Sequence, residues 1–163
     1  FGTGTHGSTR GCLVLLEALL QRQPVAHALD IGTGTGILAI AAAVLGVQRV
    51  TALDTDPDAV TAAGANIELN GVANQIHCVL SDVATVKEPA LGLVIANLLA
   101  GSHQSLASRY RRLVSPRGHL ILGGILAHET AGIREALAAH SFALADQVDI
   151  DGWVSLHLTR GRA

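Results

Sequence analysis

The residues best suited to chemistry follow the ends of short apolar segments. The clearest group is a glycine-rich turn, Gly32-Thr33-Gly34-Thr35-Gly36, which lies between an apolar run at 26–31 and a helix-like run at 37–45. Glycines let a ligand lie close to the backbone, and the first amides of a helix are free to bind polar or anionic groups. Gly32 and Gly34 are therefore candidate cofactor contacts. The turn alone does not identify the cofactor, because it also fits the dinucleotide pattern G-x-G-x-x-A.

Two aspartates follow the next two predicted strands. Asp54 is placed so that its carboxylate can accept hydrogen bonds from both hydroxyls of an adenosine ribose. The alternative, that it only caps the next helix, suits Asp56 better because Pro57 follows Asp56 directly. Asp82 is similarly placed for the exocyclic amine of adenine, and its alternative is an ordinary turn aspartate.

Polar residues also occur at the end of a fourth predicted strand and at the start of the chain. Asn97 would face a ligand bound beyond the strand ends, although asparagine also favours turns. Thr3, Thr5 and His6 lie in a glycine-rich segment that leads into a helix near Thr9. This segment lacks the lysine of a phosphate-binding loop, so we expect a mobile loop that closes over a ligand and offers hydroxyls and amides to a carboxylate.

No metal site is expected from the sequence. His128-Glu129 lacks a second histidine at position 132, where Gly132 stands, and Cys12 and Cys78 form no CxxC pair. The remaining histidines are interpreted as structural or solvated. The cysteine usage indicates a reducing, cytoplasmic setting.

The elements that position these residues alternate between strands and helices. This alternation predicts an α/β fold in which a mostly parallel, seven-stranded sheet carries helices on both faces and ends in an antiparallel hairpin. Strands are expected at 26–31, 50–53, 75–80, 91–96 and 119–122, with a turn at 115–118, helices near 8–21, 37–45, 57–70, 102–114 and 127–140, and a hairpin of 142–150 with 153–158.

Composition limits the classes of function. A chain of 163 residues with 49% hydrophobic and 15% charged residues suits one globular domain and excludes a disordered chain or a coiled coil. A net charge of −2 and only 2% aromatic residues argue against a dedicated nucleic-acid binder. The longest apolar run, 37–47, is too short to span a membrane. Arg109, Arg111 and Arg112 are expected to form a solvated helix face.

Taken together, residues 1–6, 30–42, 54–57 and 96–100 resemble the class I methyltransferases that use S-adenosylmethionine, and more narrowly the PrmA family. That family methylates L11, a stalk protein of the large ribosomal subunit. Residues 123–126 and the late Trp153-Val154 resemble it too. The resemblance covers the whole chain and favours S-adenosylmethionine over a dinucleotide.

The resemblance implies a Rossmann-like fold and a set of roles. Residues 1–163 would be the S-adenosylmethionine-dependent domain, without the N-terminal substrate-recognition domain of the family. Thr9, Gly32, Asp54 and Asn97 match cofactor contacts, and Thr3, Thr5 and His6 belong to the loop over the cofactor. The implied reaction is N-methylation of lysine or N-terminal amines of a ribosomal protein, with Asn97 orienting the amine. His6 is either a proton acceptor or a loop anchor.

Two other functions stay open at this point. One is a methyltransferase acting on a small molecule or RNA, and the other is a nicotinamide-binding module. A methyltransferase that acts on a small molecule or RNA would have the same fold as one that acts on a protein, so only the acceptor distinguishes these two interpretations.

Overall fold

The computed structural model describes residues 4–87 and 90–162, which form a seven-stranded sheet in the order β3-β2-β1-β4-β5-β7-β6. Strands β1 to β5 pair in parallel, and β7 pairs antiparallel with both β5 and β6. The seven strands and the final hairpin confirm the expected fold class. The strands are β1 (His27–Ile31), β2 (Arg49–Asp54), β3 (Ile76–Leu80), β4 (Leu91–Asn97), β5 (Val114–Leu126), β6 (Phe142–Ile150) and β7 (Trp153–Arg160).

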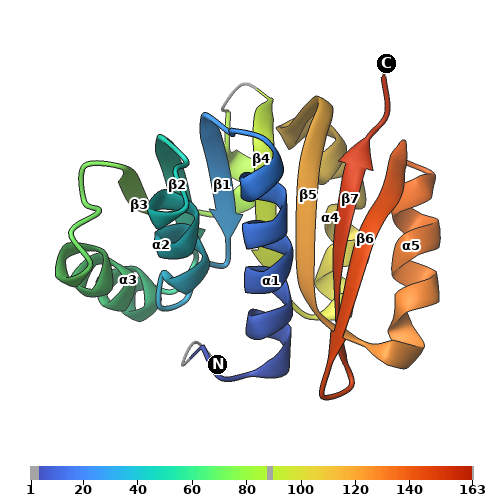
Figure 1. Ribbon diagram of the computed structural model, residues 1–163, viewed down its shortest axis with the longest axis horizontal. Helices are drawn as coiled ribbons and strands as arrows, with labels where there is room; N and C mark the ends of the chain where they lie inside the picture. The colour runs from blue at the N-terminus through green and yellow to red at the C-terminus, as the bar shows by residue number, and fades with distance from the viewer. Residues whose placement is uncertain (1–3, 88–89, 163) are drawn as a thin grey trace.

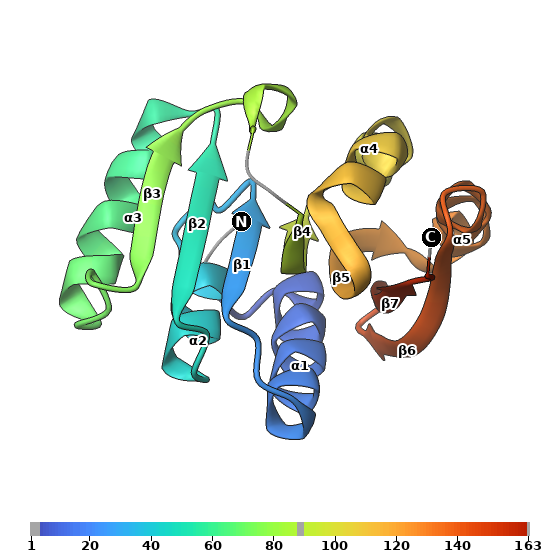
Figure 2. The same cartoon turned by 90° about the horizontal axis from the view of Figure 1, so that it is seen from above.

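Helices cover both faces of the sheet, as Figures 1 and 2 show. One buried cluster joins α1, α2 and α3 to the sheet, and a second joins α4 and α5 to the opposite face. Strand side chains alternate between these clusters, because successive residues of a strand point to opposite faces. The α-helices are α1 (Gly7–Arg22), α2 (Ile37–Val44), α3 (Pro57–Leu69), α4 (Ala100–Leu113) and α5 (Thr130–Ala138), with short 3-10 helices η1 (Val83–Thr85) and η2 (Ala127–Glu129).

The strand order reverses at β1, which pairs with β2 on one side and β4 on the other. Ligands of open α/β sheets bind beyond the carboxyl ends of the strands at such a point. Asp54 and Asn97 are the last residues of β2 and β4, so the fold brings them to this edge.

The largest departure from the expected elements is β5. Residues 115–118 do not form a turn that precedes the strand, because β5 already begins at Val114 and runs to Leu126. Its pairing with β4 shifts between Val114 and His119, and Arg117 has a φ of 63°. The proline and glycine of this segment therefore mark a bulge within the strand.

In the part of the chain that the structure describes, no helix is both long and apolar enough to cross a membrane.

Candidate active site

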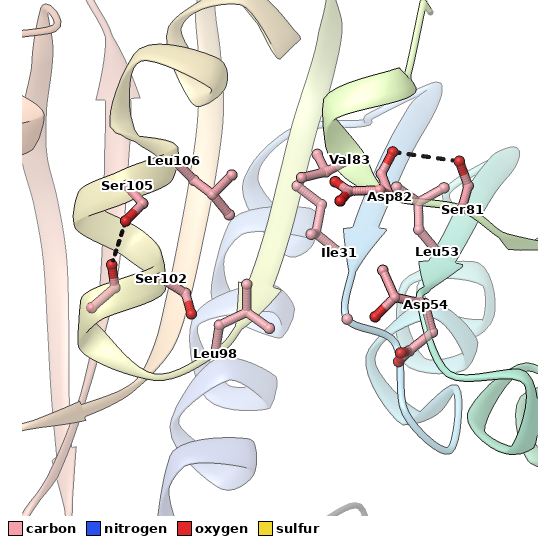
Figure 3. A pocket seen from close by; sticks show the side chains of 13 residues that line it. Ile31, Leu53, Asp54, Ser81, Asp82, Val83, Leu98, Ser102, Ser105 and Leu106 are labelled. Carbon is pink, nitrogen blue, oxygen red and sulfur yellow. Dashed lines mark hydrogen bonds between the residues drawn. The ribbon is translucent and has the colours of Figure 1, made fainter.

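A cavity of about 560 Å³ lies at the edge where the strand order reverses. Its lining includes Gly32, and its polar side chains are those of Asp54, Thr55, Ser81, Asp82, Ser102 and Ser105. Figure 3 shows the two serines of α4 on one side, Asp54 and Asp82 on the other, and Leu98 between them. Three of the predicted cofactor-binding residues, Gly32, Asp54 and Asp82, therefore share one cavity.

The glycine turn beside this cavity depends on backbone conformations that favour glycine. Gly32, Gly34 and Gly36 have φ angles of 71°, 56° and 84°. A Cβ atom on Gly32 would lie 2.5 Å from Cδ2 of Leu98, so a larger residue there would force the Leu98 side chain to move. A Cβ atom on Gly34 would meet nothing within 4 Å, which leaves that part of the backbone open to a ligand.

Asp54 is held by two backbone amides. Its Oδ2 accepts a hydrogen bond from the Gly34 amide at 2.9 Å, and its Oδ1 accepts one from the Asp56 amide at 3.1 Å. Each carboxylate oxygen keeps a second lone pair, so the side chain can still accept two hydroxyl groups. Asp56 caps α3 through the Asp58 amide at 2.9 Å with Pro57 at the first turn, which confirms that the cap is Asp56 and not Asp54.

Asp82 lines the cavity and also caps η1, since its Oδ1 accepts a hydrogen bond from the Ala84 amide at 2.8 Å. The η1 turn is in turn fixed by Arg109 of α4, which donates to the Val83 carbonyl at 3.0 Å and to the Val86 carbonyl. The expectation that Arg109 lies on a solvated face is therefore wrong. Arg109 holds the segment that carries Asp82, because its guanidinium can satisfy two turn carbonyls at once.

Asp30 lies beneath the glycine turn, outside the cavity lining, and the sequence interpretation gave no individual role to it. It is 1% exposed at the end of β1, and Thr33 donates a hydrogen bond to its Oδ2 at 2.7 Å. Its Oδ1 is buried and has no hydrogen-bond partner. Burial raises the pKa of Asp30 from 3.8 to about 6, against hydrogen bonds from Thr33 and Ala39 that lower it. The sequence signal that could have drawn attention to Asp30 is a carboxylate within an otherwise apolar strand.

Asn97 and Thr9 form a hydrogen bond with each other and do not line the cavity, although Leu98, the neighbour of Asn97, does. The Asn97 side-chain amide donates to Oγ1 of Thr9 at 3.2 Å, across a separation of 88 residues. Cβ atoms on Gly123 and Gly124 of β5 would lie 2.8 Å and 3.3 Å from Oδ1 of Asn97. The Asn97 oxygen therefore packs closely against these two glycines, and a side chain at either position would collide with its surroundings.

The segment before α1 lies between the glycine turn and the final hairpin. A Cβ atom on Gly4 would lie 2.8 Å from Ile37, the first residue of α2. The ring of His6 lies 4.7 Å from the ring of Trp153, and its Nδ1 is 2.9 Å from Oγ of Ser8. These contacts are those of a loop anchor, and the proton-acceptor role of His6 stays a prediction.

The start of α1 is also fixed to the hairpin. Ser155 of β7 donates a hydrogen bond to the Ser8 carbonyl at 3.2 Å, and Arg10 forms an exposed ion pair with Asp151 at 3.3 Å. Thr5 is exposed, and Thr3 lies outside the described residues. Among the residues that the structure describes, no group of three or more His, Cys, Asp or Glu side chains is arranged to hold a metal ion.

Known proteins resemble this chain in sequence and in structure. A relative from Rhodopseudomonas palustris (strain BisB5), named ribosomal protein L11 methyltransferase, is 40% identical over 98% of this chain and 56% of its own length. A ribosomal protein L11 methylase from Lactobacillus delbrueckii subsp. bulgaricus superposes with a TM-score of 0.88 at 31% identity, over 98% of this chain and 81% of that one. The magnesium protoporphyrin IX methyltransferase of Synechocystis PCC 6803, solved with bound SAM, has a TM-score of 0.74 at 20% identity over 99% and 85% of the two chains, and it shares the fold.

The chain spans about half the length of the curated relatives that it matches. The family model for ribosomal protein L11 methyltransferase (PrmA) matches residues 1–161. The match covers the glycine turn, both cavity aspartates and the Asn97 segment, and the chain belongs to the ribosomal protein L11 methyltransferase (PrmA) family.

Proposed function

We propose that this chain is the S-adenosylmethionine-dependent catalytic domain of a protein methyltransferase that methylates amines of ribosomal protein L11. The observation that carries the proposal is the cavity lined by Asp54 and Asp82, which lies at the strand-order reversal beside Asn97. S-adenosylmethionine supplies a methyl group on a positively charged sulfur.

The residues present suit this cofactor. The ribose hydroxyls would bind Asp54, the adenine amine would bind Asp82, and the open backbone at Gly34 would admit the ligand. The buried Oδ1 of Asp30 has no hydrogen-bond partner, so Asp30, which lies beneath the glycine turn and outside the cavity lining, is our candidate partner for the ammonium group of the ligand. Thr9, Gly32 and the loop of Thr3 and Thr5 complete the set that we assign to cofactor binding.

Asn97 is assigned to the acceptor. Its amide nitrogen is directed at Thr9, which leaves the side-chain oxygen to accept a hydrogen bond from an amine. A lysine of pKa about 10.4 needs about 4.6 kcal/mol to lose its proton at pH 7. Burial of the amine beside a positive charge lowers this cost, and alignment by Asn97 supplies the orientation that an in-line transfer requires. His6 is the candidate proton acceptor.

Substrate recognition is assigned partly to segments outside these residues, because the curated relatives are longer than this chain. We propose that the natural substrate is the stalk protein L11 in the cytoplasm, and that neither nucleic acid nor a membrane takes part. Family membership supports this choice over a small-molecule or RNA acceptor.

The test is calorimetric titration of S-adenosylhomocysteine into the wild type, Asp54→Ala and the control Asp58→Ala. Asp58 carries the same charge nearby and is exposed outside the cavity lining. Loss of the Asp54 carboxylate should weaken binding about tenfold or more, which corresponds to about 1.4 kcal/mol, whereas the control should bind normally. Unchanged affinity of Asp54→Ala, or binding of NAD in place of S-adenosylhomocysteine, would remove the assignment. Transfer of radiolabelled methyl groups to L11, with RNA as the competing acceptor, tests the substrate.

A further inference from the structure

We propose that His103 is a positioning residue that fixes the two chain segments around Asn97 and thereby sets the rate of methyl transfer. This inference rests on the proposed function and names a residue outside the cavity and outside the cofactor contacts. It concerns a buried hydrogen-bonded pair, His103 and Tyr110, on the inner face of α4.

The side chains of His103 and Tyr110 are both fully buried. His103 Nε2 lies 2.8 Å from the Gly123 carbonyl oxygen, and His103 Nδ1 lies 3.0 Å from the Tyr110 hydroxyl. Because α4 begins shortly after β4, the imidazole of His103 connects the helix that follows β4 with the end of β5.

The chemistry of these groups fixes the direction of each hydrogen bond. A carbonyl oxygen can only accept, so His103 carries a proton on Nε2. Burial lowers the pKa of His103 below its ordinary value, which keeps the ring neutral. The Nδ1 atom of a neutral ring with this tautomer is an acceptor, so Tyr110 donates its hydroxyl proton to Nδ1. Tyr110 thus selects the tautomer that can hold Gly123.

The group that His103 holds is the neighbour of Asn97. Asn97 and Gly123 are paired residues of β4 and β5. A Cβ atom on Gly123 would lie 2.8 Å from Oδ1 of Asn97, and one on Gly124 would overlap the Leu98 carbonyl oxygen. Because these segments pack without spare room, a shift of the Gly123 carbonyl must move the Asn97 oxygen. Small misplacements of an orienting group reduce turnover strongly.

The kinetic test compares four variants of the complete natural protein with the wild type. His103→Leu leaves the Gly123 carbonyl without its donor and should lower kcat about tenfold, while the affinity for S-adenosylhomocysteine changes less than about twofold. His103→Gln keeps an N–H donor and should recover part of kcat, and Tyr110→Phe should give an intermediate loss. The control Leu137→Ala removes a buried side chain of α5 from the same core and should leave kcat per folded molecule unchanged.

A second measurement does not depend on activity. Nitrogen-15 NMR of labelled histidine should show His103 as the neutral Nε2–H tautomer at pH 7 to pH 8, and Tyr110→Phe should shift the side-chain amide signal of Asn97. An Nδ1–H tautomer, a charged ring, or a kcat loss in His103→Leu no larger than in Leu137→Ala would overturn the inference. A wild-type protein that neither binds S-adenosylhomocysteine nor transfers methyl groups would instead overturn the proposed function.

Discussion

Replacing Asp30 with asparagine should change how the stability of the protein depends on pH. In the folded chain, burial raises the pKa of Asp30 from 3.8 to about 6. Each pKa unit is worth about 1.4 kcal/mol, so ionised Asp30 lowers the free energy of unfolding by about 3 kcal/mol at pH 8. Because the folded state binds the proton more tightly, stability falls as the pH rises from about 4 through about 6. An asparagine at this position does not titrate and removes this dependence.

The assay is urea unfolding of the ligand-free wild type and Asp30→Asn between pH 4 and pH 8. The amide of the variant is introduced beside Oδ1, which has no partner, and this can itself change the free energy of unfolding. Because the amide does not titrate, that change is the same at every pH. A difference in stability between the two proteins at a single pH is therefore not diagnostic. The difference in unfolding free energy between variant and wild type should instead rise by about 2.4 kcal/mol, in favour of the variant, between pH 4 and pH 8. Asp58→Asn, an exposed change, serves as the control.

The reasoning is refuted if the difference between Asp30→Asn and the wild type stays constant with pH. That result would mean that the Asp30 carboxylate ionises in the folded protein as easily as in the unfolded chain. A difference that moves in favour of the wild type with rising pH would mean that an unseen cation stabilises the carboxylate. Either result would also remove the argument that Asp30 Oδ1 binds a cationic group of the ligand.

Three further predictions concern ligand binding and turnover. If ionised Asp30 binds the cofactor, only about a tenth of the protein molecules can bind it at pH 5, because the pKa of Asp30 is about 6. The affinity for S-adenosylhomocysteine, measured by calorimetry, should therefore rise about tenfold from pH 5 to pH 7, and the affinity of Asp30→Asn should not change with pH. Asn97→Ala should lower kcat about tenfold or more with little change in cofactor affinity, and equal losses in both would make Asn97 a simple cofactor contact. Trp153, the single tryptophan of the chain, should change its fluorescence when cofactor orders the loop, and Trp153→Ala should weaken cofactor binding about two- to tenfold while Trp153→Phe does not.

The sequence predicted the strand and helix order because its apolar runs have the length and punctuation of α/β units. The strand expected at 91–96 is β4 to within one residue, and the hairpin strand expected at 142–150 is β6 without change. The predicted start of β5 was wrong because proline and glycine usually mark turns, whereas Pro116 and Gly118 lie in a bulge within this strand. Local composition cannot distinguish a turn before a strand from a bulge inside one.

Long-range contacts account for what the sequence did not reveal at the site. The sequence predicted that Asp54, Asp82 and Asn97 lie at one edge of the sheet, because the carboxyl ends of parallel strands share that edge. Arg109 was missed because its carbonyl partners, Val83 and Val86, belong to a turn 26 and 23 residues away. His103 and Tyr110 lie seven residues apart, which places them on one helix face, but only the packing shows that this face meets Gly123.

The contacts divide the site into two parts with separate supports. The part that we propose to bind the cofactor depends on β1 and β2, where Asp54 holds the Gly34 amide and Asp30 lies beneath the turn. The part that we propose to orient the acceptor depends on β4 and β5, where the glycines of β5 pack against Asn97. Damage to the first part should therefore appear as lost affinity, and damage to the second as lost turnover. The loop between them contacts Ile37 on one side and Trp153 on the other, so a change there should affect both quantities together.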